Sequence, residues 1–157
     1  MNEQKKNRIS RKSLDDFMAQ KHIAVAGVSR KKQKFGNMIF AELKKKGYRV
    51  YPVNPNIEEY EGERCYPDLH SLPGDVSAVV INTSPQSTRS LLEQAESAGI
   101  GHIWLQQGSA DQETIDLAGK SNANVISKQC IMMFAEPVTG IHAFHGWLLK
   151  VFGKYPK

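Results

Sequence analysis

The amino-acid sequence predicts an α/β fold, a three-layer sandwich in which a five-stranded, mostly parallel sheet carries helices on both faces. Two observations support this prediction. Short apolar segments alternate along the chain with amphipathic helical segments, a pattern typical of parallel strands joined by right-handed crossovers. The first apolar segment also ends in a glycine-containing turn that leads into a helix, as in Rossmann-like folds.

In the first half of the chain, several residues indicate where helices begin and end. Ser13, followed by Asp15 and Asp16, predicts the start of a helix that runs to about residue 20, because hydroxyl and carboxylate groups favour a helix N-terminus. Gly47 predicts the end of the next helix. The expected elements are a strand over 22–28, a helix over 35–46, a strand over 48–53 and an irregular connection over 54–74 with one helical turn at 68–72.

The second half of the chain continues the alternation. Ser84 and Pro85 predict a helix start, with serine as the N-cap and proline at the first helical position. The segment from Ser109 to Gln112 resembles a capping box and predicts a further helix start. The expected elements are a strand over 76–81, a helix over 85–98, a strand over 101–105, a helix over 110–120 and a strand over 124–127.

The length of 157 residues allows one domain with a substantial core. We expect a flexible basic tail over 1–12, a folded domain over 13–137 and a C-terminal extension over 138–157 that packs on the domain. This extension carries an apolar patch around Trp147 and Phe152. Packing on the sheet is the favoured role of the patch, and a homodimer contact is the alternative.

No feature of the sequence indicates a membrane or an oxidising compartment. No apolar stretch approaches the ~20 residues of a membrane-spanning helix, and the first residues are polar and basic, unlike a secretory signal. The two cysteines, Cys65 and Cys130, do not form a disulfide framework, so we expect both to be reduced. The expected location is therefore cytoplasmic.

Positive charge is concentrated in the first third of the chain. Residues 1–50 contain 14 Lys and Arg against 4 Asp and Glu, whereas the whole chain has a net charge of +5. Two interpretations stay open: a basic tail with solvated helix faces, or a positive rim that attracts a polyanion. Nucleic acid is disfavoured as a partner, because aromatic residues do not interleave with the basic ones as in proteins that bind single strands.

The turn after the first strand carries the strongest functional signal. Gly27-Val28-Ser29 precedes a cationic loop, and a helix is expected to begin near Phe35 or Gly36. Such a turn directs backbone N–H groups and a helix N-terminus at an anion, and glycine lets the ligand approach closely. The cations of the loop are Arg30, Lys31, Lys32 and Lys34. The turn therefore predicts a ligand that bears phosphate.

The same region departs from the NAD-binding fingerprint at two points. Ser29 stands where the second glycine of G-x-G-x-x-G is expected, and the second strand ends in Asn54-Pro55-Asn56 without an acidic residue for the ribose 2′-hydroxyl. A ligand with an additional phosphate near its ribose fits this pattern better than NAD does. Coenzyme A, with its 3′-phosphate, and NADP are the two candidates.

Residues suited to catalysis or metal binding are sparse. The predicted strand-end loops are poor in acids and contain no histidine, and neither a Gly-x-Ser-x-Gly motif nor a P-loop occurs. Cys130 follows the last strand and could exchange with the thiol of bound CoA, although a packing role is favoured. His142 and His145 could share a helix face, but a zinc site needs three or four ligands, so no metal is expected.

Several motifs occur in order between about residues 20 and 137. They are Gly27-Val-Ser29, Lys34-Phe-Gly-Asn37, Gly47-Tyr-Arg-Val-Tyr-Pro-Val-Asn-Pro55, Gly62-Glu-Arg-Cys-Tyr-Pro-Asp-Leu69, Asn82-Thr-Ser-Pro85, His102-Ile-Trp-Leu-Gln-Gln-Gly108 and Cys130-Ile-Met-Met-Phe-Ala-Glu-Pro137. In this order the chain resembles the single-domain CoA-binding protein family. That family shares the Rossmann-like CoA-binding domain of the succinyl-CoA synthetase alpha subunit.

The resemblance implies a binding site for CoA. Gly27, Val28 and Ser29 would receive a phosphate, and Asn54 with Pro55 would bracket adenine and ribose. The adenosine diphosphate end would be lined by Lys34, Phe35 and Gly36, and the pantetheine path by Thr83, Ser84, Pro85, Gln107 and Gly108. The ligase activity is not carried over, because the synthetase requires a phosphorylated histidine on a second domain and a partner subunit.

Together these features predict a protein that binds CoA or an acyl-CoA and has no evident catalytic machinery. An NADP-linked oxidoreductase is an alternative, although no catalytic Tyr/Lys pair or histidine is identified for it. A protein that binds nucleic acid or another macromolecule through its basic first third is the other alternative. The ligand is expected to be a small molecule, and no membrane is expected as a partner.

Overall fold

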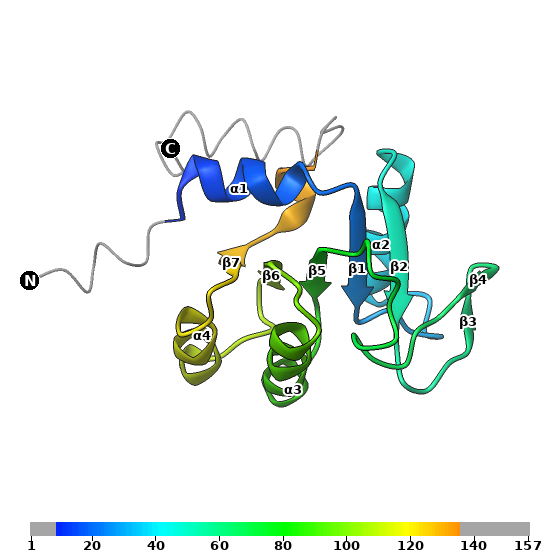
Figure 1. The fold of residues 1–157 in the computed structure, drawn as a ribbon. Helices are drawn as coiled ribbons and strands as arrows, with labels where there is room; N and C mark the ends of the chain where they lie inside the picture. Colours follow the sequence, from blue (N-terminus) through cyan, green and yellow to red (C-terminus); the bar gives the residue numbers. More distant parts are fainter. Residues whose placement is uncertain (1–8, 136–157) are drawn as a thin grey trace, which may run out of the picture.

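The computed structural model describes residues 9–135 and contains the predicted five-stranded sheet (Figure 1). Its strands lie in the order β2-β1-β5-β6-β7, and all four neighbouring pairs are parallel. The strands are β1 (His22–Ala26), β2 (Arg49–Val53), β5 (Ala78–Ile81), β6 (His102–Gln106) and β7 (Asn124–Gln129). The chain order reverses between β1 and β5, which makes the ends of these strands a crevice where ligands bind in such folds.

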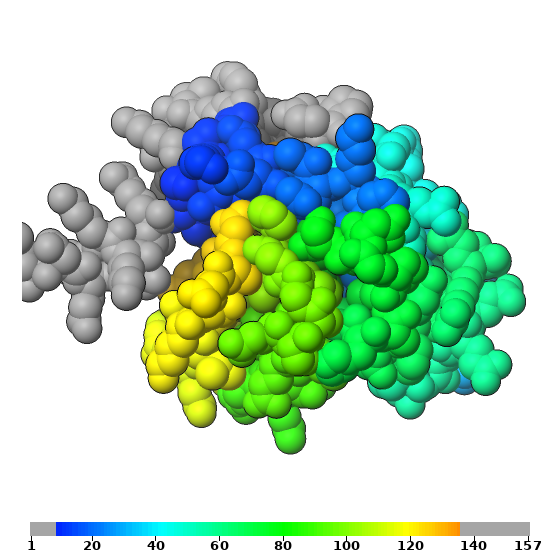
Figure 2. All heavy atoms as spheres, viewed as in Figure 1, coloured from blue at the N-terminus to red at the C-terminus, as the bar shows by residue number. Residues whose placement is uncertain are grey.

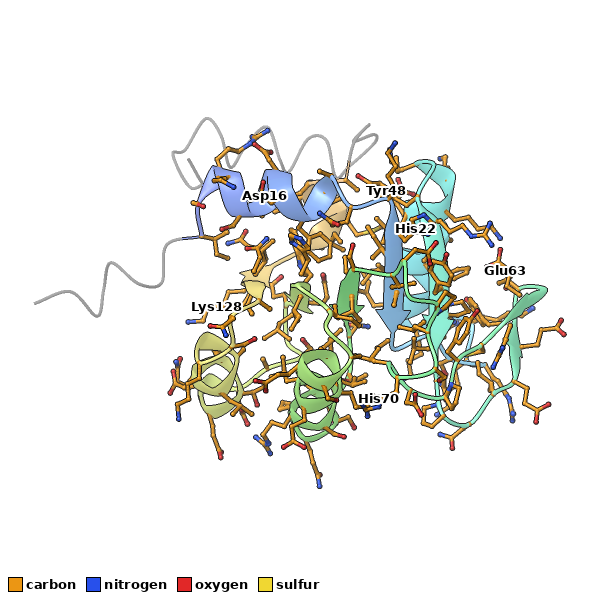
Figure 3. The ribbon with its side chains drawn as sticks, in the orientation of Figure 1. Asp16, His22, Tyr48, Glu63, His70 and Lys128 are labelled. Carbon is orange, nitrogen blue, oxygen red and sulfur yellow. The ribbon has the colours of Figure 1, made fainter. Side chains whose placement is uncertain are left out.

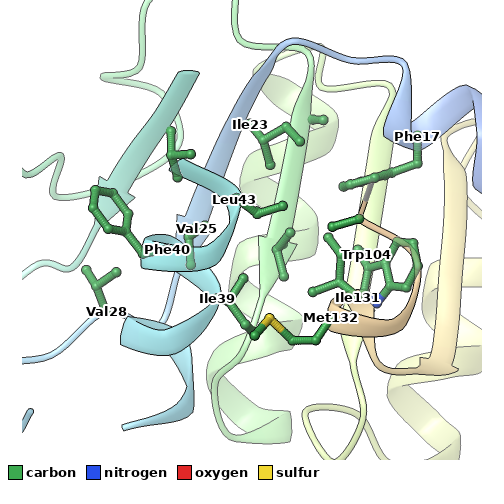
Figure 4. Close-up of a cluster of buried hydrophobic side chains, with 14 of the residues drawn as sticks. Phe17, Ile23, Val25, Val28, Ile39, Phe40, Leu43, Trp104, Ile131 and Met132 are labelled. Atoms are coloured by element: carbon green, nitrogen blue, oxygen red, sulfur yellow. The ribbon is translucent and has the colours of Figure 1, made fainter. Parts of the chain in front are cut away.

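Helices cover both faces of the sheet, and each face has its own apolar cluster. On one face lie α1 (Arg11–Met18), α2 (Phe35–Lys45) and the 3₁₀ turn η1 (Ile131–Met133), around Phe17, Ile39, Trp104 and other side chains shown in Figure 4. On the other face lie α3 (Pro85–Ser97) and α4 (Gln112–Gly119), which pack on Val79, Ile81 and Leu105. The structure is therefore the Rossmann-like three-layer α/β fold that the sequence predicts.

The inner strands are short and apolar because both of their faces are buried. All four residues of β5 are fully buried, and β1 is buried from Ile23 onward. Alternate side chains enter opposite clusters, as in β1, where Ile23 and Val25 face α2 and Ala24 and Ala26 face α3. Burying apolar surface at about 25 cal/mol per Å² is the main source of stability in such a core.

Two helices begin at residues other than the predicted ones. α1 begins at Arg11 and not at Ser13, because the Ser10 side chain accepts a hydrogen bond from the Ser13 N–H and acts as the N-cap. α4 is capped by Asp111, whose carboxylate accepts the Thr114 N–H at 2.8 Å. Ser109 is instead buried, with its hydroxyl donating to the Gln106 carbonyl at 2.6 Å. The Ser84 cap of α3 is confirmed.

The connection over residues 54–74 contains a small hairpin that the sequence analysis missed. Its strands β3 (Glu59–Tyr60) and β4 (Glu63–Arg64) are antiparallel, and Gly62 in the turn has a positive φ of 76°. Residues 68–72 form a turn, not the expected helical one, in which Asp68 accepts the Ser71 N–H at 2.8 Å. In Figures 1 and 2 the hairpin lies beyond β2 at the edge of the molecule.

The last strand runs longer than expected and contains an irregularity. β7 extends to Gln129, and its register against β6 shifts near Lys128, which has a positive φ of 59°. Among residues 9–135, none of the helices has the length and apolar character needed to cross a lipid bilayer. Of the basic tail expected over 1–12, residues 1–8 lie outside the described residues, and Arg11 and Lys12 belong to α1. The C-terminal extension expected over 138–157 lies wholly outside the described residues.

Candidate functional site

The turn after β1 and the start of α2 are packed so closely that neither of two glycines could carry a side chain. A Cβ at Gly27, whose φ is +128°, would lie 2.3 Å from the Asn82 carbonyl oxygen. A Cβ at Gly36 would lie 2.2 Å from the Gly27 carbonyl oxygen. We call residues 27–29 the glycine bend. Gly27 of the bend and Gly36 of α2 together let β1, β5 and the N-terminus of α2 meet at one point.

Asn37 in the first turn of α2 holds the glycine bend in shape. Its Oδ1 accepts the Ser29 N–H at 2.8 Å, and its Nδ2 donates to the carbonyls of Ser29 and Lys31 at 2.9 and 3.0 Å. The side chain is buried, so these bonds are protected from water. Because Asn37 occupies the Ser29 N–H, this donor is not open to a ligand.

Other donors at the glycine bend remain available. No residue among 9–135 accepts a hydrogen bond from the Val28 N–H, and Val28 is otherwise buried in the core. α2 has Lys34 as its N-cap, which supplies no side-chain hydrogen bond to the first N–H groups. An uncapped helix N-terminus carries a partial positive charge and binds anions. The exposed cations Arg30, Lys31, Lys32 and Lys34 add to this positive potential.

Asn54 joins the loop after β2 to the glycine bend. Its Nδ2 donates to the Val28 carbonyl at 2.8 Å, and its Oδ1 accepts the Asn56 N–H at 2.8 Å. A second link is the Arg30 guanidinium, which donates to the Asn56 carbonyl at 2.8 Å. The amide of Asn54 is therefore engaged within the protein, and its main role is to position this loop against the bend.

A pocket of about 390 Å³ opens beside the glycine bend, between the ends of β1 and β2 and one face of α3. Its volume lies within the range of small-molecule sites. The lining residues are Ala26, Gly27, Val53, Asn54, Pro55, Asn56, Pro67, Thr83, Ser87, Ser90, Leu91 and Gln94. None of these side chains carries a charge, so the pocket suits a neutral, partly apolar group that forms hydrogen bonds. The charged rim and the neutral pocket meet at Gly27.

The pocket brings together Gly27, Asn54, Pro55 and Thr83, four of the residues predicted from the sequence. The others lie elsewhere. Val28 and Gly36 are buried at the bend, Phe35 packs against the core, and Lys34 is exposed. Ser84 and Pro85 form the cap and first residue of α3, and Gln107 and Gly108 are exposed after β6. None of these belongs to the pocket lining.

The face of α3 that lines the pocket was not predicted. Ser87, Ser90, Leu91 and Gln94 recur at a spacing of three and four residues, which places them along one stripe of the helix. This spacing was visible in the sequence beside the apolar stripe of Leu92 and Ala95. The Gln94 Oε1 accepts the Leu69 N–H at 3.1 Å, which ties α3 to the loop that carries Pro67.

Neither cysteine lies in the pocket lining. Cys130 is partly exposed and packs against the cluster on the α1 and α2 face. Cys65 is buried, with its Sγ 3.8 Å from the Asn54 carbonyl oxygen, and burial raises the pKa of its thiol. Within residues 9–135, no three His, Cys, Asp or Glu side chains gather as a metal site would require. His142 and His145, which the sequence analysis considered as metal ligands, lie outside the described residues.

A glycine bend at the switch point of a parallel α/β sheet is typical of the class of domains that bind phosphate-bearing ligands. Comparison with known proteins identifies the family within this class. The profile of the CoA binding domain matches residues 21–136. The chain belongs to this CoA-binding domain family. The match begins just before β1 and extends to the end of the described residues, so it contains every residue of the pocket lining.

Individual relatives agree with this assignment. The chain is 30% identical over 129 residues to the alpha subunit of an ADP-forming acetate–CoA ligase II of Pyrococcus furiosus, covering 75% of this chain and 28% of the subunit. It is 26% identical over 111 residues to the uncharacterized protein YneT of Bacillus subtilis, covering 71% of this chain and 82% of that protein. The chain thus spans less than a third of the ligase subunit.

Solved structures show the same architecture. A hypothetical protein from Pyrococcus horikoshii superposes with a TM-score of 0.74 at 29% identity, covering 82% of this chain and 92% of that one. A dinucleotide-forming acetyl-coenzyme A synthetase 1 of Ca. Korarchaeum cryptofilum, in its apo form, gives a TM-score of 0.64 at 25% identity, covering 72% of this chain and 27% of the enzyme. The fold thus occurs both alone and as part of larger enzymes.

Proposed function

We propose that this protein binds coenzyme A, or an acyl-CoA, at the glycine bend and the adjoining pocket. The observation that carries the proposal is the junction of two unlike surfaces at Gly27. On one side lie the α2 N-terminus, the Val28 N–H and the cationic loop; on the other lies an uncharged pocket. CoA has this same division, because its diphosphate and 3′-phosphate are strongly anionic, whereas the adenine on the same ribose is uncharged.

In this proposal the diphosphate lies against the Val28 N–H and the first turn of α2. The 3′-phosphate faces the loop cations, among which Arg30 is already tied to Asn56 at the pocket rim. Adenine enters the pocket between the proline rings of Pro55 and Pro67 and the side chain of Leu91. Stacking on flat or apolar side chains and hydrogen bonds to Ser and Gln groups suit a base.

The pantetheine arm would then leave along Thr83. The Thr83 hydroxyl lies 2.9 Å from the Thr88 hydroxyl, which in turn donates to the Ser109 carbonyl at 2.7 Å. These contacts through the buried Thr88 hold Thr83 beside α3 and beside the loop after β6, in which Gln107 and Gly108 are exposed. Cys130 follows the next strand, β7, and packs against the apolar cluster on the α1 and α2 face, so we propose a packing role for it.

We further propose that the protein binds its ligand without chemical conversion. The pocket lining supplies no carboxylate, histidine, lysine or thiol, and general acid–base or nucleophilic catalysis needs such groups within hydrogen-bond reach of the substrate. The activities named for the ligase relatives belong to chains of which this one covers less than a third.

A ligand panel tests the proposal. Thermal unfolding is measured with CoA, acetyl-CoA, NADP, NAD and ATP, each at the same concentrations. A ligand at a hundredfold excess over its Kd stabilises the folded state by about 2.7 kcal/mol, which is a clear shift. CoA is expected to give the largest shift. A larger shift with NADP than with CoA would overturn the proposal in favour of a dinucleotide. Native mass spectrometry of the purified protein shows in addition whether a ligand is retained.

A further inference from the structure

A second groove runs along the outer edge of β2, on the side away from β1. It has a volume of about 380 Å³ and shares no lining residue with the pocket of the candidate CoA site, although both include residues of β2. Its lining residues are Lys44, Tyr48, Arg49, Val50, Tyr51, Pro52, Glu63, Arg64 and Tyr66. Tyr48 precedes β2 and Glu63 lies on the hairpin, and both are labelled in Figure 3.

The backbone of β2 presents one unpaired residue to this groove. Along a parallel strand, the backbone N–H and carbonyl groups of successive residues point alternately to the two sides. The Arg49 N–H points toward β1, where it donates to the Lys21 carbonyl at 2.9 Å. The N–H and carbonyl of Val50 and the carbonyl of Pro52 therefore point outward. The Pro52 carbonyl accepts the Tyr66 N–H at 2.9 Å, which closes the edge there. Within residues 9–135, the N–H and carbonyl of Val50 have no hydrogen-bond partner.

Val50 therefore meets the groove through its backbone. Its side chain belongs to the buried cluster on the α2 face, and the residue as a whole is 6% exposed. A strand edge with an unpaired donor and acceptor can add a further strand, and this is a recurring mode of peptide recognition. Tyr66 limits the free stretch, so an added segment would be short.

The charges around Val50 decide which segment fits. Lys44 forms an ion pair with Glu63 at 2.9 Å, which leaves Arg49 and Arg64 as the excess positive charge of the lining. The Arg64 guanidinium lies 4.9 Å from the centre of the Tyr66 ring. The Arg49 guanidinium lies 5.8 Å from the centre of the Tyr51 ring, which neighbours Tyr66. Both arginines are exposed, so their guanidinium groups remain available to an acidic partner beside the open backbone.

We propose that the β2 edge is a second binding site, which takes a short, extended, acidic peptide segment of another protein as an added strand. One residue of the segment exchanges both backbone hydrogen bonds with Val50 in antiparallel orientation. The Asp or Glu side chains of the segment contact Arg49 and Arg64. This site is independent of the proposed CoA site, because it lies along the outer edge of β2, whereas the CoA site lies beyond the carboxyl end of that strand.

Fluorescence anisotropy of the full chain tests this proposal with a labelled, end-capped octapeptide that alternates Glu and Val. We expect saturable binding that weakens as salt rises. A matched peptide that alternates Lys and Val is expected not to bind. A third peptide, N-methylated at every residue of the Glu/Val sequence, cannot form the strand hydrogen bonds and is also expected not to bind. Equal binding of the N-methylated peptide overturns the proposal in favour of a simple anion site.

Protein variants locate the site. The double charge reversal Arg49→Glu/Arg64→Glu should weaken peptide binding at least about tenfold, whereas the remote Lys12→Glu/Lys120→Glu variant, with the same net charge, should not. The thermal shift with CoA should be unchanged in both variants, which separates a failure here from a failure of the CoA proposal. Peptide affinity that is the same in both charge-matched variants overturns the site. Displacement of the peptide by inorganic phosphate, but not by chloride at equal ionic strength, also overturns it.

Discussion

The side-chain amide of Asn37 forms two hydrogen bonds with the backbone of Ser29, accepting its N–H at 2.8 Å and donating to its carbonyl at 2.9 Å. The two residues are eight positions apart, and Asn37 belongs to the first turn of α2. This clamp means that the helix N-terminus and the glycine bend are one rigid unit. An anion bound at the bend would thus meet donors that are already in place, and preorganisation of this kind reduces the entropic cost of binding.

Substitution of Asn37 by leucine should cost stability and ligand affinity together. The backbone groups of Ser29 and Lys31 would lose their partners, and each buried unsatisfied group costs about 1–3 kcal/mol. We expect urea unfolding to show destabilisation of this order and calorimetry to show weaker CoA binding. Asn122→Leu, at an exposed position, is the control. Equal stability of the two variants would contradict the clamp.

Gly36→Ala tests the close approach of α2 to the glycine bend. The added Cβ would lie 2.2 Å from the Gly27 carbonyl oxygen, so the helix start or the bend must move. Overpacking of this kind typically costs about 1–3 kcal/mol. Gly119→Ala is the matched control, because a Cβ at that helical glycine meets nothing within 4 Å. It should be neutral or slightly stabilising, since alanine favours a helix over glycine.

Ser29→Glu should abolish CoA binding while the fold persists. Ser29 is partly exposed at the bend, where a carboxylate would oppose the ligand's phosphates. Ser29→Gln, which has the same size without the charge, separates electrostatics from steric effects and should retain much of the affinity. Titration by calorimetry of both variants is the measurement. If the two bind CoA equally well, the phosphates do not lie at the bend.

The sequence was sufficient for the fold because the inner strands of the sheet, such as β1 and β5, are apolar on both faces. The small hairpin was missed for the opposite reason, since Glu59, Glu63 and Arg64 in its strands are polar and no periodic pattern marks them. The sequence analysis wrongly assigned the N-cap of α4 to Ser109, whereas Asp111 caps this helix. Only the packing shows that Ser109 is buried and already bonded to Gln106.

The candidate site was predicted in part. Gly27 and Asn54 could be recognised because the turn and the absent acid are local features. The hydrogen bonds that hold the bend and the loop in place could not be recognised, because those between Asn37 and Ser29 and between Asn54 and Val28 join residues 8 and 26 positions apart. The face of α3 with Leu91 and Gln94 had a spacing signal, but serines and glutamines at helical spacing are also typical of a solvated surface.

Leu91→Trp tests whether the pocket receives part of the ligand. The indole would occupy much of the pocket between α3 and Pro67, so CoA affinity should fall at least about tenfold, which corresponds to about 1.4 kcal/mol. Leu117→Trp, on the exposed surface of α4, controls for the added aromatic ring. Inorganic pyrophosphate should compete for the bend equally well in both variants. Unchanged CoA affinity of Leu91→Trp would show that adenine lies elsewhere.

The stability of the protein should fall in mild acid, and His102 provides a specific cause. Burial lowers the pKa of His102 from its ordinary value of 6.5, with Asp16 opposing the shift. The Asn124 Nδ2 lies 3.3 Å from the His102 Nδ1 and is a donor, so a proton on that nitrogen would face another N–H.

The direction of the pH effect follows from this lowered pKa. The unfolded chain binds a proton at His102 near pH 6.5, whereas the folded chain does so only at lower pH. Stability from this group is therefore complete above about pH 6.5 and is lost as pH falls toward the folded-state pKa. Urea unfolding at several pH values is expected to show a shallower acid slope in His102→Gln than in the unmodified protein. His70→Gln, which changes an exposed histidine, is the control, and an equal reduction of the slope in both variants would exclude His102 as the cause.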